Sequence, residues 1–172
     1  MKCRKIIIIL VALTVMTVCC VAFIFGNSLK NSTESNDQTM AVMDILSSVA
    51  GVFGIRGDIN PSVLRNFAHV AEFCLLGVCL ALVSFCLVHK NRKITFRQCA
   101  IHWSVSVAVG ICVAVIDEIL QLFSEGRVSD IYDVGLDTVG VLIGTTLAYA
   151  GCFAFYKFVI QRRVKKNGAS AE

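Results

Sequence analysis

Four long apolar runs constrain the fold of this chain more than any other feature of its sequence. They cover residues 6–25, 67–88, 101–123 and 134–160. A helix needs about 20 apolar residues to cross a bilayer, and each run meets that length. Hydrophobic residues make up 56% of the 172 residues and the mean hydropathy is +0.75, which leaves little sequence for a soluble domain. The sequence predicts an all-α integral membrane protein, a single domain over residues 1–172 with four transmembrane helices in an antiparallel bundle.

The Lys and Arg residues predict which way this bundle faces, because the cytoplasmic loops of membrane proteins collect them. They gather before the first run, between the second and third runs, and after the fourth run in a basic tail, residues 161–172, that is expected to be frayed. Both termini are therefore expected in the cytoplasm, and the loops at 26–66 and 124–133 are expected outside. Of the twelve acidic residues, only Glu172 then lies on the inner side. The outer side is predicted to be acidic and to attract cations or basic groups.

The nine cysteines predict neither a disulfide framework nor a CxxC zinc site, because none lies in either predicted outer loop. Seven of them lie inside the apolar runs, where cysteine serves as a small apolar residue. The first run has the basic start of a signal peptide, but it is long, and Phe25-Gly26-Asn27 is a poor cleavage site. We therefore expect a retained first helix.

Capping signals predict where the spanning helices begin and end. Asn60 followed by Pro61 predicts the start of the second spanning helix. Thr95 and Ser129 are predicted to cap the third and fourth, and Gly126 to end the third.

The first outer loop contains an apolar stripe at helical spacing over residues 39–53. This segment is too short to span a membrane, so it predicts an amphipathic helix that lies on the outer surface or covers the helix ends. Ser35 with Gln38 is predicted to cap it, and residues 29–38 are expected to be irregular.

Ionisable residues inside the apolar runs are the main indication of function, because such groups are costly in hydrocarbon. Each of the last three runs carries a set of polar residues on one helix face, within it or beside its end, separated by three or four residues. The sets are Arg65, His69 and Glu72; Asp117 and Gln121, with Glu118 one step round; and Asp130, Asp133 and Asp137. The last stripe continues into Gly140 and Gly144, small residues that permit close helix packing, so it is predicted to face protein.

The similar depth of these residues in the membrane predicts that they lie close together. At a rise of about 1.5 Å per residue, Glu72, Asp117 and Asp137 all lie within roughly 10 Å of the outer ends of their runs. Some of the candidate residues also have a simpler interpretation, whereas the adjacent acids Asp117 and Glu118 are hard to explain as packing residues. His69 can be a hydrogen-bonded packing residue, Asp130 and Asp133 can serve only to stabilise a helix start, and Arg127 can be a solvated loop residue.

Three of these segments together resemble the VanZ-like family. The resemblance rests on Asp117-Glu118-x-x-Gln121, on Gly126-Arg127, and on Asp133-x-x-x-Asp137-Thr138-x-Gly140, supported by Arg65-x-x-x-His69-x-x-Glu72 and Asn27-Ser28. It implies a bacterial cytoplasmic-membrane protein with several helices, in a family named after a member associated with lowered susceptibility to teicoplanin. Asp137 departs from the pattern, since asparagine is frequent there, and the first outer loop is long.

Two functions are compatible with this outer polar pocket. One is an enzyme acting on a phospholipid or a polyprenyl-linked precursor, with a catalytic set of His69, Glu118, Asp117 and Gln121, of which His69 or Glu118 is the general base. In such an enzyme, Arg65 and Arg127 bind phosphate. A divalent cation can join the acids that line the substrate site, which are Glu72, Asp130, Asp133 and Asp137.

The other function is a non-catalytic envelope protein that binds a lipid, a drug or a partner. Ion transport is disfavoured because the inner half of each run lacks such acids, and nucleic-acid binding is not supported because the net charge of +4 comes from the cytoplasmic flanks.

Overall fold

The computed structural model describes residues 2–52, 60–89, 96–126 and 130–168 and forms five helices over them. They are α1 (Lys2–Ser28), α2 (Ser32–Val52), α3 (Pro61–His89), α4 (Phe96–Gln121) and α5 (Ile131–Gly168), and these described residues contain no strand. All except α2 are long and apolar enough to cross a membrane. This confirms the predicted all-α membrane fold with four spanning helices.

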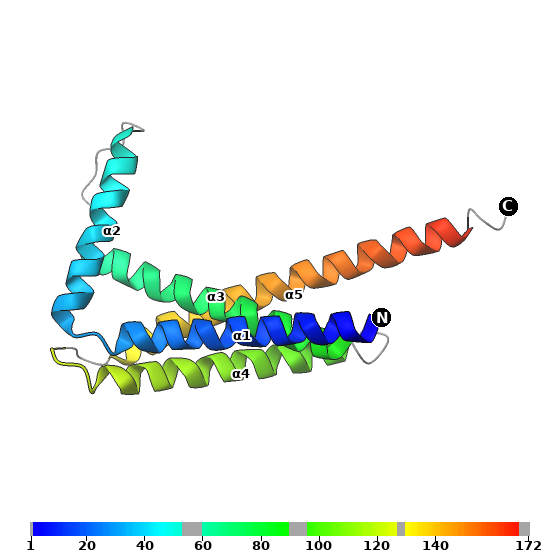
Figure 1. Ribbon diagram of the computed structural model, residues 1–172, viewed down its shortest axis with the longest axis horizontal. Helices are drawn as coiled ribbons and strands as arrows, with labels where there is room; N and C mark the ends of the chain where they lie inside the picture. Colours follow the sequence, from blue (N-terminus) through cyan, green and yellow to red (C-terminus); the bar gives the residue numbers. More distant parts are fainter. Residues whose placement is uncertain (1, 53–59, 90–95, 127–129, 169–172) are drawn as a thin grey trace.

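The bundle is built around the crossing of α3 and α5, which form its most extensive contact (Figure 1). Glycines permit this close approach. A Cβ atom added to Gly144 would collide with the carbonyl group of Cys74, and one added to Gly140 would lie 2.5 Å from the carbonyl oxygen of Val70. The predicted small-residue face of the last helix therefore packs against α3, as glycine-based contacts do in lipid.

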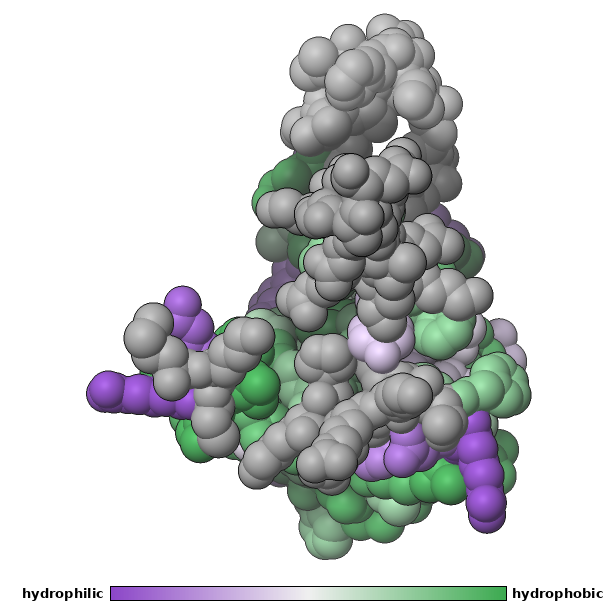
Figure 2. Space-filling view, turned by 90° about the vertical axis from the view of Figure 1, so that its right-hand side faces the viewer, coloured by the Kyte–Doolittle hydropathy of each residue, from purple (hydrophilic) through white to green (hydrophobic). Residues whose placement is uncertain are grey.

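The helices α1 and α4 pack against this central pair. The core between them is apolar and includes Ile24, Phe73, Ala114 and Val141. Most other large hydrophobic side chains of the spanning helices are exposed, as expected for surfaces that face lipid. Figure 2, seen from the end of the bundle where both termini lie, shows such side chains on the flanks and a few long hydrophilic ones projecting at the edge.

Hydroxyl groups connect α3, α4 and α5 in the half of the bundle nearer the termini. The Ser84 hydroxyl lies 2.6 Å from the Tyr149 hydroxyl and 2.9 Å from that of Ser106, and all three side chains are buried. Hydrogen bonds between membrane helices are favourable because the hydroxyls have no water to replace them. Their role is to hold the helices together.

The helix α2 begins at the other end of the bundle, touches α3, and then projects away from the bundle (Figure 1). It confirms the predicted helix in the first outer loop but begins earlier than expected, since residues 32–38 are helical rather than irregular. The cap is Asn31, whose side-chain oxygen accepts a hydrogen bond from the Glu34 N–H at 2.8 Å. Ser35, the predicted cap, lies inside the helix.

Of the other predicted caps, the one at the start of α3 is confirmed, since Asn60 Oδ1 accepts the Ser62 N–H at 2.9 Å. The predictions for the start of α5 and the end of α4 differ from the structure. The residue that caps α5 is Asp130, whose Oδ1 accepts the Tyr132 N–H at 2.9 Å. Thr95 and Ser129 lie outside the described residues. Gly126 has a φ of 74°, but it follows the turns after α4 rather than directly ending the helix.

The last helix is longer than predicted. Residues 161–168 of the predicted frayed tail are a continuous part of α5. Figure 1 shows this end of α5 extending past the other helices, toward the end of the bundle where α1 begins.

Candidate functional site

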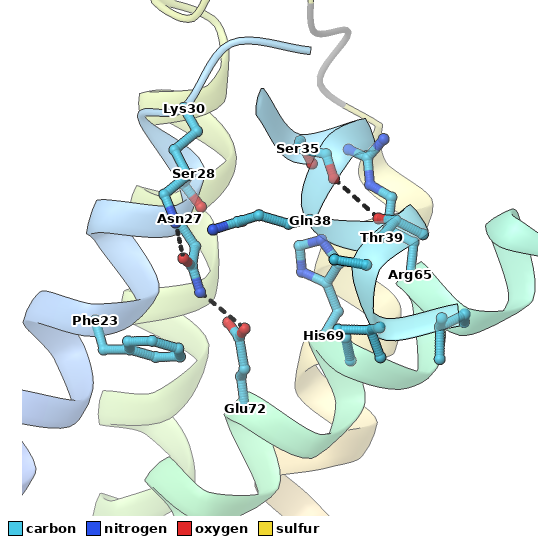
Figure 3. A pocket seen from close by; sticks show the side chains of 14 residues that line it. Phe23, Asn27, Ser28, Lys30, Ser35, Gln38, Thr39, Arg65, His69 and Glu72 are labelled. Carbon is cyan, nitrogen blue, oxygen red and sulfur yellow. Dashed lines mark hydrogen bonds between the residues drawn. The ribbon is translucent and has the colours of Figure 1, made fainter. Parts of the chain in front are cut away.

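A cavity of about 450 Å³ opens between the end of α1, the first half of α2 and the start of α3. Lys30, Arg65, His69 and Glu72 are among the residues that line it, as Figure 3 shows. The size falls within the range of small-ligand pockets, roughly 300–1,000 Å³. Cationic and acidic groups therefore face one cavity at the end of the bundle that carries the acids.

A relay of hydrogen bonds crosses from the rim of this cavity to its wall (Figure 3). The Lys30 ammonium donates to Asn27 Oδ1 at 2.8 Å, and the Asn27 amide donates to Glu72 Oε1 at 3.0 Å. The relay orients the Glu72 carboxylate toward the cavity. It also places a positive charge two side chains away from that carboxylate.

Asp117 is fully buried beneath the cavity and accepts hydrogen bonds from two helices. The Ser28 hydroxyl donates to its Oδ1 at 2.6 Å, and the Gln121 amide donates to its Oδ2 at 3.1 Å. The Ser124 hydroxyl also donates to the Ser28 carbonyl at 2.8 Å, which joins the ends of α1 and α4. The position of the Asp117 carboxylate is therefore fixed by its neighbours.

His69 of α3 faces Asp137 of α5. Its Nδ1 atom lies 3.4 Å from Asp137 Oδ1, which exceeds the usual N–H···O distance of about 2.7–3.2 Å. The Nδ1 atom is buried, yet 12% of the His69 side chain is exposed, so the exposed part belongs to the rest of the ring. His69 thus reaches from the buried acid to the cavity wall.

Glu118 of α4 contacts the start of α5. Its side chain is buried, and its Oε2 accepts the backbone N–H of Asp130 at 3.1 Å. An acid at this position is stabilised by the positive end of the helix dipole. Glu118 is not among the residues that line the cavity, and its predicted role as a general base stays a prediction.

The structure brings most of the predicted site residues together, but not all. Asp117 and Asp137 are buried near His69, Gln121 is buried and donates to Asp117, and Arg65 and Glu72 line the cavity with His69. By contrast, Asp130 is exposed and caps α5, while Asp133 is half-buried and does not line the cavity. Arg127 lies outside the described residues.

Sequence reasoning gave no site role to Lys30, and it noted Asn27 and Ser28 only through the family resemblance. Ser28 and Asn27 bind the site acids directly, and Lys30 completes the relay. A signal for them exists in the sequence, because polar residues directly after an apolar run fall at the same depth as acids near the ends of neighbouring runs.

Three side chains have the chemistry and spacing of metal ligands. His69, Asp117 and Asp137 can each offer one ligand atom, and these atoms lie within 4.8 Å of one another. They come from α3, α4 and α5. The three helices thus converge on one small buried space next to the cavity.

Comparison with known proteins gives one match. The sequence profile of the VanZ/LLP1 family matches residues 7–156. This range spans α1 to α4 and much of α5, and it includes every residue of the cavity and of the buried cluster. No curated protein and no solved structure matches the chain.

Proposed function

The chain belongs to the VanZ/LLP1 family, and on this premise we propose that its cavity binds the phosphate-bearing head group of an envelope lipid and supports chemistry on it. A phospholipid and a polyprenyl-linked precursor share this chemistry. The observation that carries the proposal is the composition of the cavity. Lys30 and Arg65 supply cationic donors for a phosphate, while Glu72 and His69 supply groups that can exchange protons.

The location of the cavity also supports a lipid ligand. It lies at the ends of spanning helices, beside the exposed apolar residues Val63 and Phe67 at the start of α3. A lipid whose acyl or prenyl chain follows this apolar surface can place its phosphate beside Arg65. The Lys and Arg distribution favours the outer leaflet for this end.

Proton transfer is assigned to the cavity wall rather than to the whole predicted catalytic set. Of that set, only His69 lines the cavity, and Glu72 lines it as well. Asp117, Glu118 and Gln121 are buried and engaged in hydrogen bonds, so they position the site. Changes in teicoplanin susceptibility would follow from altered head groups at the cell surface.

The test compares lipid binding by the wild-type protein and by a Lys30→Gln/Arg65→Gln variant in nanodiscs. The labelled ligands are phosphatidylglycerol and a polyprenyl diphosphate. Loss of two charge-assisted contacts, each about 1.5–3 kcal/mol, is expected to weaken binding of the preferred ligand at least roughly a hundredfold. Lys5→Gln, which removes an exposed charge at the other end of the bundle, is the control and should bind as wild type.

Product formation in the same samples separates the two candidate roles. Turnover that falls in Glu72→Gln or His69→Gln supports an enzyme. Binding without product, under conditions that include divalent cations, favours a non-catalytic binding protein. Equal binding by the double variant and the wild type contradicts the proposed cavity.

A further inference from the structure

We propose that His69, Asp117 and Asp137 form a binding site for one first-row divalent cation, Mn²⁺ or Zn²⁺. The inference goes beyond head-group binding, because it concerns the buried space behind the cavity. It rests on the spacing of three potential ligand atoms, on an unsatisfied buried carboxylate, and on the charge of the cluster.

The spacing of the three side chains is close to what a bound ion imposes. Metal–ligand bonds of about 2.0–2.2 Å place two ligands roughly 3–4.4 Å apart. The His69 Nδ1 to Asp137 Oδ1 distance of 3.4 Å lies inside that range, and all three ligand atoms lie within 4.8 Å of one another. Small side-chain rotations are enough to complete the coordination.

Asp137 gives the independent indication of a ligand. Its side chain is fully buried, and neither of its oxygens receives a hydrogen bond from the residues that the structure describes. The Nδ1 atom of His69, which faces Asp137, is likewise without a hydrogen bond in this part of the chain. A buried carboxylate without donors is strongly unfavourable, so these atoms indicate a group that binds between them.

The charge of the cluster favours a cation as that group. Asp117 and Asp137 bring two carboxylates into one buried space, where repulsion between like charges is strong. A divalent ion would neutralise both. Asp117 is already oriented by Ser28 and Gln121.

The donor set selects the kind of metal. Imidazole suits transition metals such as Zn²⁺, while carboxylates also suit Mn²⁺, and Mg²⁺ prefers oxygen ligands alone. One nitrogen and two carboxylates therefore fit Mn²⁺ or Zn²⁺. With Nδ1 engaged by the metal, Glu72 is left as the cavity-lining group for proton transfer.

The experiment measures Mn²⁺ binding to the metal-stripped, full-length protein in detergent without added lipid. Mn²⁺ is used because the cysteines, as thiolates, would compete for Zn²⁺. Electron paramagnetic resonance reports free Mn²⁺, so a titration gives both stoichiometry and affinity. The wild type is expected to bind about one ion, and Zn²⁺ is expected to displace it.

Two ligand variants and one control decide the outcome. Asp137→Asn and His69→Gln should each weaken Mn²⁺ binding at least roughly tenfold, as expected for loss of a ligand. Glu125→Gln, the same kind of change at an exposed position, should bind as wild type. Elution as a single species in size-exclusion chromatography confirms that each variant is folded.

The proposal is overturned if the wild type does not bind Mn²⁺ at millimolar concentration, or if both ligand variants bind it like wild type. Neither result depends on lipid, so failure here leaves head-group binding intact. Conversely, a protein that binds Mn²⁺ through these residues but does not bind lipid retains the metal site and contradicts only the proposed function.

Discussion

Ser28, the last residue of α1, donates a 2.6 Å hydrogen bond to Asp117 of α4 although 89 positions separate them in the chain. Both side chains are buried. The bond joins the first spanning helix to the carboxylate at the centre of the site. The α1 helix is therefore part of the site and contributes more than an apolar surface.

Removing this hydroxyl should destabilise the bundle. Ser28→Ala removes a hydrogen bond to the buried Asp117 carboxylate, which is expected to lower the free energy of unfolding by about 1–3 kcal/mol. Denaturant titration in detergent micelles measures the change. Ser104→Ala removes an exposed hydroxyl of α4 and should have little effect. Equal losses of stability in the two variants would show that the Ser28–Asp117 hydrogen bond does not specifically stabilise the bundle.

Glycine substitutions on α5 should have opposite effects at two positions. Gly144→Ala places a methyl group against the Cys74 carbonyl and is expected to cost about 1–3 kcal/mol of stability. At Gly151 nothing lies within 4 Å of an added Cβ, so Gly151→Ala should be neutral or stabilise the helix by up to about 1 kcal/mol. Thermal unfolding in detergent compares them. A stable Gly144→Ala variant would contradict the observed helix crossing.

Metal should change the relative stability of Asp137→Asn and the wild type. In chelator, the variant is expected to be at least as stable, because the substitution removes a buried charge without donors. With Mn²⁺ at about 100 times its Kd, the wild type should gain about 2.7 kcal/mol and the variant much less. The two melting temperatures, measured with and without Mn²⁺, check this. Identical shifts in both proteins would indicate that the ion binds elsewhere.

The orientation of the bundle is open to a fusion test. Because Lys and Arg collect on the cytoplasmic side, a reporter fused after Gly168 should lie in the cytoplasm. Green fluorescent protein at this position is expected to fluoresce, and alkaline phosphatase to be inactive. The reverse pattern would place the cavity in the cytoplasmic leaflet and redirect the search for its lipid.

The spanning helices and the buried cluster were predictable because both follow from rules that need only the spacing of residues along the sequence. Apolar length identifies a spanning helix, and a three- or four-residue spacing identifies a helix face. Asp117 and Asp137 were expected at one depth on antiparallel helices, and the structure places both near His69. The roles of these residues in catalysis or binding remain predictions.

The details that were not predicted depend on choices between competing local signals or on distant contacts. Both Asn31 and Ser35 are good helix caps, and the sequence does not say which one the chain uses. The hydrogen bond from the Asp130 backbone N–H to Glu118 depends on the placement of the start of α5 and was not predicted. Asp130 and Asp133 shared a stripe with Asp137, but they lie at the start of α5, one to two turns before Asp137, and they are less buried.

The glycine crossing of α3 and α5 has a consequence for the geometry of the cluster. Gly140 contacts Val70, so one of the close steric fits of this crossing lies beside His69 and about one turn from Asp137. Axial sliding of one helix along the other by a single turn, about 5.4 Å, would move these two ligands out of register. The steric fit opposes such sliding, so backbone shape helps to maintain the distance between the imidazole and the carboxylate.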